Sequence, residues 1–319
     1  MRPADSAIFC LAPGTNGELW LGGARELFGR LALAQFTNVA RPGARHATSR
    51  RGQPCDITTV TQSIVVHRGD VYVAGHEYCE GPGFHDFHAN LLERFDGRAF
   101  SPLPPPTKAA GRVDLAFHEG RAGRLYATAL NAAGDAWSST LFELASSDWN
   151  PLLSLDTEAA TLPVEDAQSR LWLVGIGKQG AAEPPTAVLR RDGTVWSREQ
   201  APAFGNLVAA TDGALFYQGA RALWLREGST WVARPAPPGN FIIQLLARSA
   251  VDAFVLVYPS AVWHFDGKHF ERVPIDGVVE GDPPGRMAWN GQHLWLASFR
   301  RIWKLASDGE ASSPPITAR

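Results

Sequence analysis

A short apolar strand pattern returns seven times along the chain. Each copy has a large side chain at its centre, aliphatic neighbours on both sides, and a turn of polar or small residues before it. The copies are Glu18–Gly22, Asp70–Ala74, Arg124–Thr128, Arg170–Val174, Ala214–Gln218, Asp252–Leu256 and His293–Ala297. Aliphatic and aromatic residues in runs this short are typical of buried β-strands. The recurrence constrains the fold more than any other feature of the sequence.

The central aromatic residues, from Trp20 to Trp295, follow one another at intervals of 38 to 54 residues. Intervals in this range are typical of propeller blades, because a four-stranded sheet cannot bury both faces alone and packs on its neighbours around an axis. We therefore predict an all-β fold, a seven-bladed β-propeller of four-stranded antiparallel blades that forms one domain over residues 1–319. The expected blades are approximately 6–39, 56–101, 112–151, 159–198, 206–234, 241–273 and 286–315.

Within each repeat we label the strands A to D outward from the axis, so that the seven copies are the B strands. A C strand follows six of the copies. Five of these strands end at an acidic residue and a glycine, namely Asp96–Gly97, Asp192–Gly193, Glu227–Gly228, Asp266–Gly267 and Asp308–Gly309. These pairs predict two-residue hairpin turns. A large aromatic residue four positions after the acidic one, such as Trp196 or Trp231, is expected to begin strand D and to pack between blades. Each blade is expected to be contiguous, with a frayed last strand.

Two of the copies also indicate a resemblance. Gly17–Gly22 and, more loosely, Ser169–Val174 resemble the Gly-x-Leu-Trp-x-Gly repeat of seven-bladed β-propellers, in particular the periplasmic sensor propellers of two-component regulators. The chain lacks the Trp-Asp ends of one large propeller class and the paired glycines of the kelch class. The resemblance implies a recognition or scaffold role, although one propeller architecture serves many functions.

Composition excludes several classes of function. The formal net charge is −2 and the pI is about 6.5, so no overall positive field attracts nucleic acid. The sequence has no apolar run of about 18 residues that predicts a membrane span. Met1–Ser6 lacks the apolar core of a signal peptide, which predicts a cytoplasmic protein as given, or an exported one if a leader was removed. We find no catalytic motif, which favours a protein that is not an enzyme.

The long connections of such a propeller gather on one face, which carries the D-to-A crossovers and the B-to-C loops. Five of the nine histidines lie between residues 46 and 88, and all of these except His67 fall within two expected loops of blade 2, at 40–56 and 76–90. His76, Cys79, His85 and His88 offer the donors that zinc or another divalent metal accepts, and carboxylates lie between them. Their spacing matches no zinc motif, so a polar surface loop is the alternative.

Other chemistry is also plausible for these loops. Arg41, Arg45, Arg50 and Arg51, with His46, offer planar forks for a carboxylate, phosphate or sulfate, or for ion pairs with Glu77, Glu80 and Asp86. A disulfide competes for Cys79. If Arg68–Gly69 forms the turn between strands A and B, Cys79 faces position 58, three residues from Cys55, and a bulge or bend would let the two cysteines pair.

Three hypotheses about function remain open. The leading one is a non-enzymatic binding or scaffold module that presents its long-loop face, centred on 41–56 and 76–90, to a protein partner. The first alternative is a metal-dependent hydrolase or lyase with its site in the blade 2 loops. The second is a carbohydrate-binding lectin, with Trp137 and Trp289 as candidates for sugar stacking. A small anionic ligand or a glycan is a further candidate partner, and nucleic acid is not expected.

Overall fold

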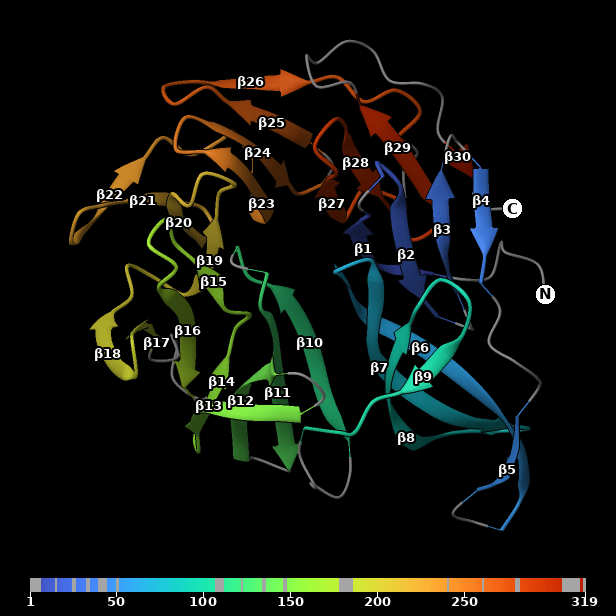
Figure 1. The fold of residues 1–319 in the computed structure, drawn as a ribbon. Coiled ribbons are helices and arrows are strands. Elements are labelled where there is room, and N and C mark those ends of the chain that lie inside the picture. The colour runs from blue at the N-terminus through green and yellow to red at the C-terminus, as the bar shows by residue number, and fades with distance from the viewer. Residues whose placement is uncertain are drawn as a thin grey trace.

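The computed structural model describes residues 7–14, 16–24, 27–32, 35–39, 45–49, 52–106, 112–121, 123–133, 136–145, 148–177, 186–239, 241–259, 261–278, 282–305 and 316–317. Every regular element in this part of the chain is a strand, and the strands form seven antiparallel sheets. The sheets stand around a common axis like the blades of a propeller (Figure 1). The predicted all-β, seven-bladed fold is confirmed.

Blades 1 to 3 contain the strands β1 (Ile8–Pro13), β2 (Leu19–Gly23), β3 (Phe28–Ala32), β4 (Gln35–Asn38), β5 (His46–Thr48), β6 (Pro54–His67), β7 (Asp70–Gly81), β8 (Phe84–Phe95), β9 (Phe100–Pro102), β10 (Val113–Glu119), β11 (Leu125–Ala133), β12 (Ala136–Ala145) and β13 (Asp148–Leu155). Blade 2 departs from the four-stranded pattern, because β5 pairs with the start of β6 and adds a fifth strand.

Blades 4 to 7 contain β14 (Glu158–Ala160), β15 (Val164–Glu165), β16 (Leu171–Gly177), β17 (Thr186–Asp192), β18 (Val195–Gln200), β19 (Gly205–Ala209), β20 (Leu215–Gly219), β21 (Leu223–Glu227), β22 (Thr230–Arg234), β23 (Ile242–Ser249), β24 (Asp252–Val257), β25 (Ala261–Phe265), β26 (Phe270–Val273), β27 (Arg286–Trp289), β28 (Leu294–Ala297), β29 (Arg301–Leu305) and β30 (Ile316–Thr317). In blade 4 the inner strand is split, since β14 and β15 both pair with β16.

The apolar core lies between adjacent blades. The central residues of the seven repeats are nearly inaccessible to solvent, as Trp172, Phe216 and Trp295 illustrate. One cluster joins blade 1 to blade 7, with Leu19, Leu21 and neighbouring residues of blade 1 against Trp295 and others of blade 7. The ring therefore closes by packing contiguous blades against each other.

Side-chain amides connect the inner strands to one another. Each inner strand has one edge without a strand partner, so its peptide groups need other hydrogen-bond partners. Gln244 Oε1 accepts from Met287 N at 2.7 Å, and Gln244 Nε2 donates to Met287 O at 3.0 Å. Gln218, in the second strand of blade 5, also contacts the inner strand of blade 6, since its Oε1 accepts from Leu245 N at 2.8 Å. These amides join successive blades near the axis.

The acidic-glycine pairs lie at the C-to-D turns as predicted, but not all of the turns are two-residue hairpins. Phe95 pairs with Phe100, so residues 96–99 form a four-residue loop. Asp96 Oδ1 accepts the backbone N–H groups of Arg98 and Ala99, both at 2.8 Å. An aspartate that holds two peptide groups stabilises the longer loop, which the dipeptide alone does not reveal. The Asp308–Gly309 pair lies outside the described residues.

Candidate functional site

The D-to-A crossovers and B-to-C connections of the seven blades lie on one side of the ring, which we call the crossover face. The A-to-B and C-to-D turns lie on the opposite side, which we call the turn face. On the crossover face blade 2 extends well beyond its neighbours, because β6 has 14 residues and β7 and β8 have 12 each. In Figure 1, β5 marks the outer part of this extension at the lower right.

This extension, formed by residues 45–49, 52–59 and 77–89, is called the arm. Its inner limit is the row of His76 and Asn90, where Asn90 Oδ1 accepts a hydrogen bond from Val113 N, the first residue of the blade 3 inner strand. The prediction of an irregular loop over 76–90 was wrong. These residues form a β-hairpin, and Pro82–Gly83 make its turn, with φ of 79° at Gly83, which suits a type II turn.

The two cysteines of the arm are joined. Cys55 and Cys79 form a disulfide with a Cα–Cα distance of 5.4 Å. A bulge between Thr61 and Ser63 shifts the register of β6 against β7 by one residue, so that Cys79 faces Ile57 rather than position 58. Cys55 is then two residues from the facing position and on the same side of the sheet, which brings the sulfur atoms together.

The four candidate metal ligands are not brought together. Cys79 is disulfide-bonded, and His76 and His85 belong to rows of the hairpin separated by the Tyr78–Phe87 pair. His85 stacks on Tyr78, with 4.3 Å between ring centres, and its Nδ1 lies 2.9 Å from Glu80 Oε1. His88 is the extra residue of a bulge in β8 and is exposed. Over the described ranges no three His, Cys, Asp or Glu side chains form a group suited to a metal ion.

His76 lies at the base of the arm and is fully buried. Its Nε2 lies 3.3 Å from Val113 O and 3.3 Å from Asp114 Oδ1, in the first residues of β10. Burial lowers the pKa of His76, with a further lowering from Arg112, so the ring is neutral near pH 7. A neutral imidazole that donates to a backbone carbonyl fastens the arm to blade 3.

The structure shows one of the predicted ion pairs between the arginines and the acidic residues of these loops. Arg45 Nη1 lies 2.5 Å from Glu77 Oε1, and the Glu77 side chain is largely buried. His46 Nδ1 lies 2.8 Å from Asp56 Oδ1 on the other side of the arm sheet. Asp86 faces Cys79 across the hairpin. Arg41, Arg50 and Arg51 lie outside the described residues, so the anion clamp stays a prediction.

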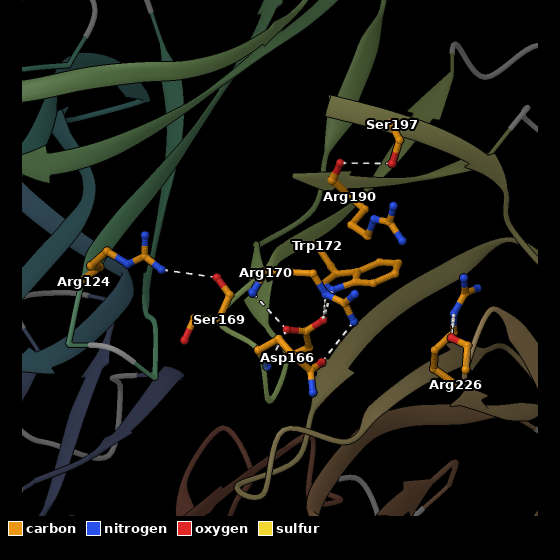
Figure 2. Close-up of polar contacts among 10 residues, drawn as sticks. Arg124, Asp166, Ser169, Arg170, Trp172, Arg190, Ser197 and Arg226 are labelled. Atoms are coloured by element: carbon orange, nitrogen blue, oxygen red, sulfur yellow. Dashed lines mark hydrogen bonds and ion pairs between the residues drawn. The ribbon is translucent and has the colours of Figure 1, made fainter. Parts of the chain in front are cut away.

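The carboxylates near the axis have structural partners. Figure 2 shows Asp166 with Arg170 and Trp172: Asp166 Oδ2 accepts from Arg170 Nε at 2.6 Å and from Trp172 Nε1 at 2.8 Å. Burial raises the pKa of Asp166, but these hydrogen bonds outweigh it and hold the pKa below its ordinary value. Glu165 accepts from Tyr126 Oη at 2.7 Å. These groups stabilise the junction of blades 3 and 4 and do not form an acid pair that faces solvent.

Sequence reasoning missed a set of aromatic residues on the crossover face. Among the described residues, four aromatic side chains other than histidine count as exposed: Phe204 at 44%, Phe241 at 44%, Tyr258 at 46% and Phe299 at 58%. We call them the aromatic rim. All four belong to crossovers or B-to-C turns of blades 5 to 7. Phe241 and Tyr258 stack with ring centres 4.9 Å apart and planes 7° apart.

A small cleft adjoins the aromatic rim where blade 7 meets blade 1. It has a volume of about 90 Å³, and Phe9, Pro283, Arg286 and Phe299 are among its lining residues. Phe9 and Phe299 meet edge to face, 6.5 Å apart, and Arg286 Nε donates to Phe9 O at 3.2 Å. The walls of the cleft are therefore largely apolar, with Arg286 as a fixed polar group.

The lectin candidates among the tryptophans lie elsewhere. Trp289 is partly buried, with Arg248 over its ring at 4.7 Å and Phe254 stacked at 6.4 Å, so it belongs to the packing between blades 6 and 7. Trp137 lies in β12, paired with Ala132, and is also partly buried. The described part of the chain has no helix long and apolar enough to span a membrane.

No family model matches the chain, and no curated protein matches its sequence. Among solved structures, it is similar to YCF48 from Cyanidioschyzon merolae, with a TM-score of 0.60 and 12% identity over 97% of this chain and 98% of that one. A structure of YCF48 bound to D1 peptide matches with a TM-score of 0.61 and 12% identity, over 98% and 95% of the chains.

The Dos1 propeller matches with a TM-score of 0.58 and 9% identity, over 98% of this chain and 84% of that one. Identities this low show a common fold alone. They confirm the predicted resemblance to propeller repeat proteins at the level of architecture.

Proposed function

We propose that this protein is a non-enzymatic binding module that holds a protein partner on its crossover face. One observation carries the proposal: the four residues of the aromatic rim all lie on the face from which the arm projects. Among the described residues, the large hydrophobic side chains exposed at the turns of the turn face are Val195 and Val251, and both are aliphatic. An asymmetry of this kind is what a recognition surface produces.

The chemistry of the rim suits protein recognition. Exposed aromatic rings offer a large contact area with few rotatable bonds, so they lose little conformational entropy when a partner orders them. The cleft beside Phe299 adds a place where one apolar side chain of the partner is desolvated. The arm adds a second wall, raised above the ring by the disulfide-joined hairpin.

The structural comparison supports a protein-binding function. YCF48, whose fold this chain shares, has been solved with a D1 peptide bound. A propeller of about this size is therefore able to hold a peptide. We infer the same general role here and make no inference about the identity of the partner.

Two alternatives have less support. A metal-dependent hydrolase or lyase in blade 2 would need converging ligands, whereas Cys79 is disulfide-bonded and His76 and His85 lie in separate rows. A propeller lectin would present equivalent pockets in successive blades. The exposed aromatic residues occupy non-equivalent positions, since Phe204 and Phe241 belong to crossovers while Tyr258 and Phe299 belong to B-to-C turns.

The test compares two matched surface variants. The rim variant carries Phe241→Ser, Tyr258→Ser and Phe299→Ser, and the control carries Val195→Ser and Val251→Ser on the turn face. A partner captured with the wild-type chain is purified, and its affinity for all three proteins is measured by calorimetry. We expect at least a tenfold loss for the rim variant and less than a twofold change for the control. Equal affinity of wild type and rim variant would refute the proposal.

A further inference from the structure

We propose that Asn16 is a site of spontaneous deamidation, and that the isoaspartate formed there loosens the junction between blades 1 and 7. The site lies in the A-to-B turn of blade 1, between β1 and β2, and so on the turn face. It is on the opposite side of the ring from the arm and the aromatic rim. The inference therefore goes beyond the proposed function and does not depend on it.

The chemistry follows from the residue that comes next in the chain. Asparagine is a thermolabile residue, and a following glycine makes it more so because glycine has no Cβ to hinder its nitrogen. Gly17 N loses its proton to water and attacks Asn16 Cγ. A bond forms between these two atoms, the Cγ–Nδ2 bond of Asn16 breaks, and ammonia leaves with a proton from solvent.

Water then opens the cyclic imide at one of its two carbonyls, and Gly17 N recovers its proton. Cleavage of the bond between Gly17 N and Cγ gives aspartate. Cleavage of the bond between Gly17 N and the backbone carbonyl of residue 16 gives isoaspartate, in which the main chain runs through Cγ and gains a carbon atom. The net reaction consumes water and releases ammonia, and nothing is oxidised or reduced.

The sequence contains two asparagine–glycine pairs, Asn16–Gly17 and Asn290–Gly291. The structure restrains the second pair. Asn290 Nδ2 donates to Gly17 O at 2.7 Å, and Asn290 Oδ1 accepts from the N–H groups of Gln292 at 3.1 Å and His293 at 2.8 Å. Rotation of this side chain onto the nitrogen of the following glycine would disrupt these hydrogen bonds, so the fold protects Asn290.

The side chain of Asn16 has no such restraint. It is exposed, and the described structure gives its amide no hydrogen-bond partner. The backbone N–H of Asn16 donates to Glu18 Oε2 at 3.1 Å, which does not hold the side chain. Gly17 N, the attacking atom, donates to no backbone acceptor within the described ranges. The reacting groups are therefore unrestrained in one pair and restrained in the other.

The product acts on the ring through Gly17. Gly17 O accepts the hydrogen bond from Asn290 that joins a turn of blade 1 to a turn of blade 7, and Gly14 N donates to Glu18 O at 2.8 Å across the same turn of blade 1. An additional main-chain carbon before Gly17 lengthens this turn and displaces Gly17 O from Asn290 Nδ2. The buried apolar contacts between blades 1 and 7 remain, so the expected effect is local loosening and not unfolding.

The first experiment follows both pairs in one sample. The full-length protein is incubated in mildly alkaline buffer, either native or in urea, and is then digested with trypsin. Peptides 1–25 and 287–300 contain one asparagine each, so mass spectrometry with fragmentation measures the two rates separately. In the native protein we expect Asn16 to deamidate at least about tenfold faster than Asn290, because only Asn290 must release hydrogen bonds. In urea the two rates should agree within about threefold.

The second experiment measures the effect on the ring. Aged protein is separated from unmodified protein by ion exchange, and chromatography of peptide 1–25 distinguishes isoaspartate from the aspartate of an Asn16→Asp variant. This variant is the matched control, because it has the added charge without the added carbon. We expect hydrogen exchange at the Gly14 and His293 amides to rise about tenfold in the isoaspartate form and by less than about twofold in Asn16→Asp. An Asn16→Ser protein, aged in parallel, should not change.

The site and its effect on the ring are refuted by different results. Equal rates at the two pairs in the native protein, or no deamidation at Asn16, would overturn the assignment of the site. Isoaspartate at position 16 with the same hydrogen exchange as Asn16→Asp would overturn the effect on the ring. An equal rise in aged Asn16→Ser would do the same, since it would assign the loosening to another modification. Partner binding is tested separately by the rim variant.

Discussion

Loss of the Cys55–Cys79 disulfide should weaken the whole fold. The perturbation is the double substitution Cys55→Ser and Cys79→Ser, which leaves no unpaired thiol in the arm. The bond closes a loop over a sequence separation of 24 residues that contains the A-to-B hairpin of blade 2. Chain-entropy arithmetic for a loop of this length gives about 3.5 kcal/mol of stabilisation, through restriction of the unfolded chain.

Urea unfolding, followed by tryptophan fluorescence, measures this difference. We expect the free energy of unfolding of the oxidised wild type to exceed that of the double variant by up to about 3.5 kcal/mol. Hydrogen exchange of residues 77–89 should also rise in the variant, because the hairpin loses its covalent link to β6. A difference below about 0.5 kcal/mol would refute the reasoning, since surface substitutions alone reach that size.

Thiol counting is the control on the starting state. Cys10 is buried, and burial raises its pKa to about 12, so iodoacetamide should label no cysteine in the native oxidised protein. After denaturation without reductant one thiol should react, and after reduction all three cysteines of the chain should react. Three labelled thiols without reductant would show that the bond is absent and would place the working protein in a reducing compartment.

Three further predictions concern stability, each measured by urea unfolding. Burial lowers the pKa of His118 to about 4, so the unfolded chain takes up a proton near pH 6.5 that the fold rejects. The stabilisation is complete above pH 6.5, and about 3 kcal/mol of it is lost as pH falls to 4. The same pH dependence of the free energy of unfolding in His118→Asn would contradict this. Gly75→Ala would place its Cβ 1.9 Å from a carbonyl oxygen of β6 and should lower the free energy of unfolding by about 3 kcal/mol. The control, Gly285→Ala, has nothing within 4 Å of its Cβ and should lower it by less than about 0.5 kcal/mol. Equal losses would show that β6 moves to accommodate the methyl group. Gln244→Ala removes both hydrogen bonds to the inner strand of blade 7 and should lower the free energy of unfolding by about 2 kcal/mol. An unchanged free energy of unfolding would mean that water replaces these hydrogen bonds.

The core of each blade was predictable from the sequence because its strands are buried on both faces. Leu171–Val174 is a continuous apolar run, and the structure buries Trp172 and its neighbours between blades 3 and 5. Glycine at the C-to-D turns was also informative, since positive φ at Gly97 and Gly193 is a local requirement that the chain reveals directly.

The sequence predicted a loop where the structure has the arm, and this error has a physical reason. Both faces of its sheet meet solvent in large part, so residues 77–89 show no alternation between apolar and polar positions. The one local signal was Pro82–Gly83, a type II turn pair between two stretches of β-forming residues. The register that aligns Cys55 with Cys79 depends on the bulge at Thr61, and sequence periodicity does not report a bulge.

The sequence by itself determined the architecture: the number of blades, the position of strands B and C in each, and the residues that form the core. These follow from local propensity and from the need of every apolar run to be buried. Only the tertiary structure decided which aromatic residues remain exposed and which carboxylates find hydrogen-bond partners. Phe299 and Trp295 are four residues apart, yet one is exposed and the other buried. That difference arises from the packing of blade 7 against blade 1, which no short stretch of chain contains.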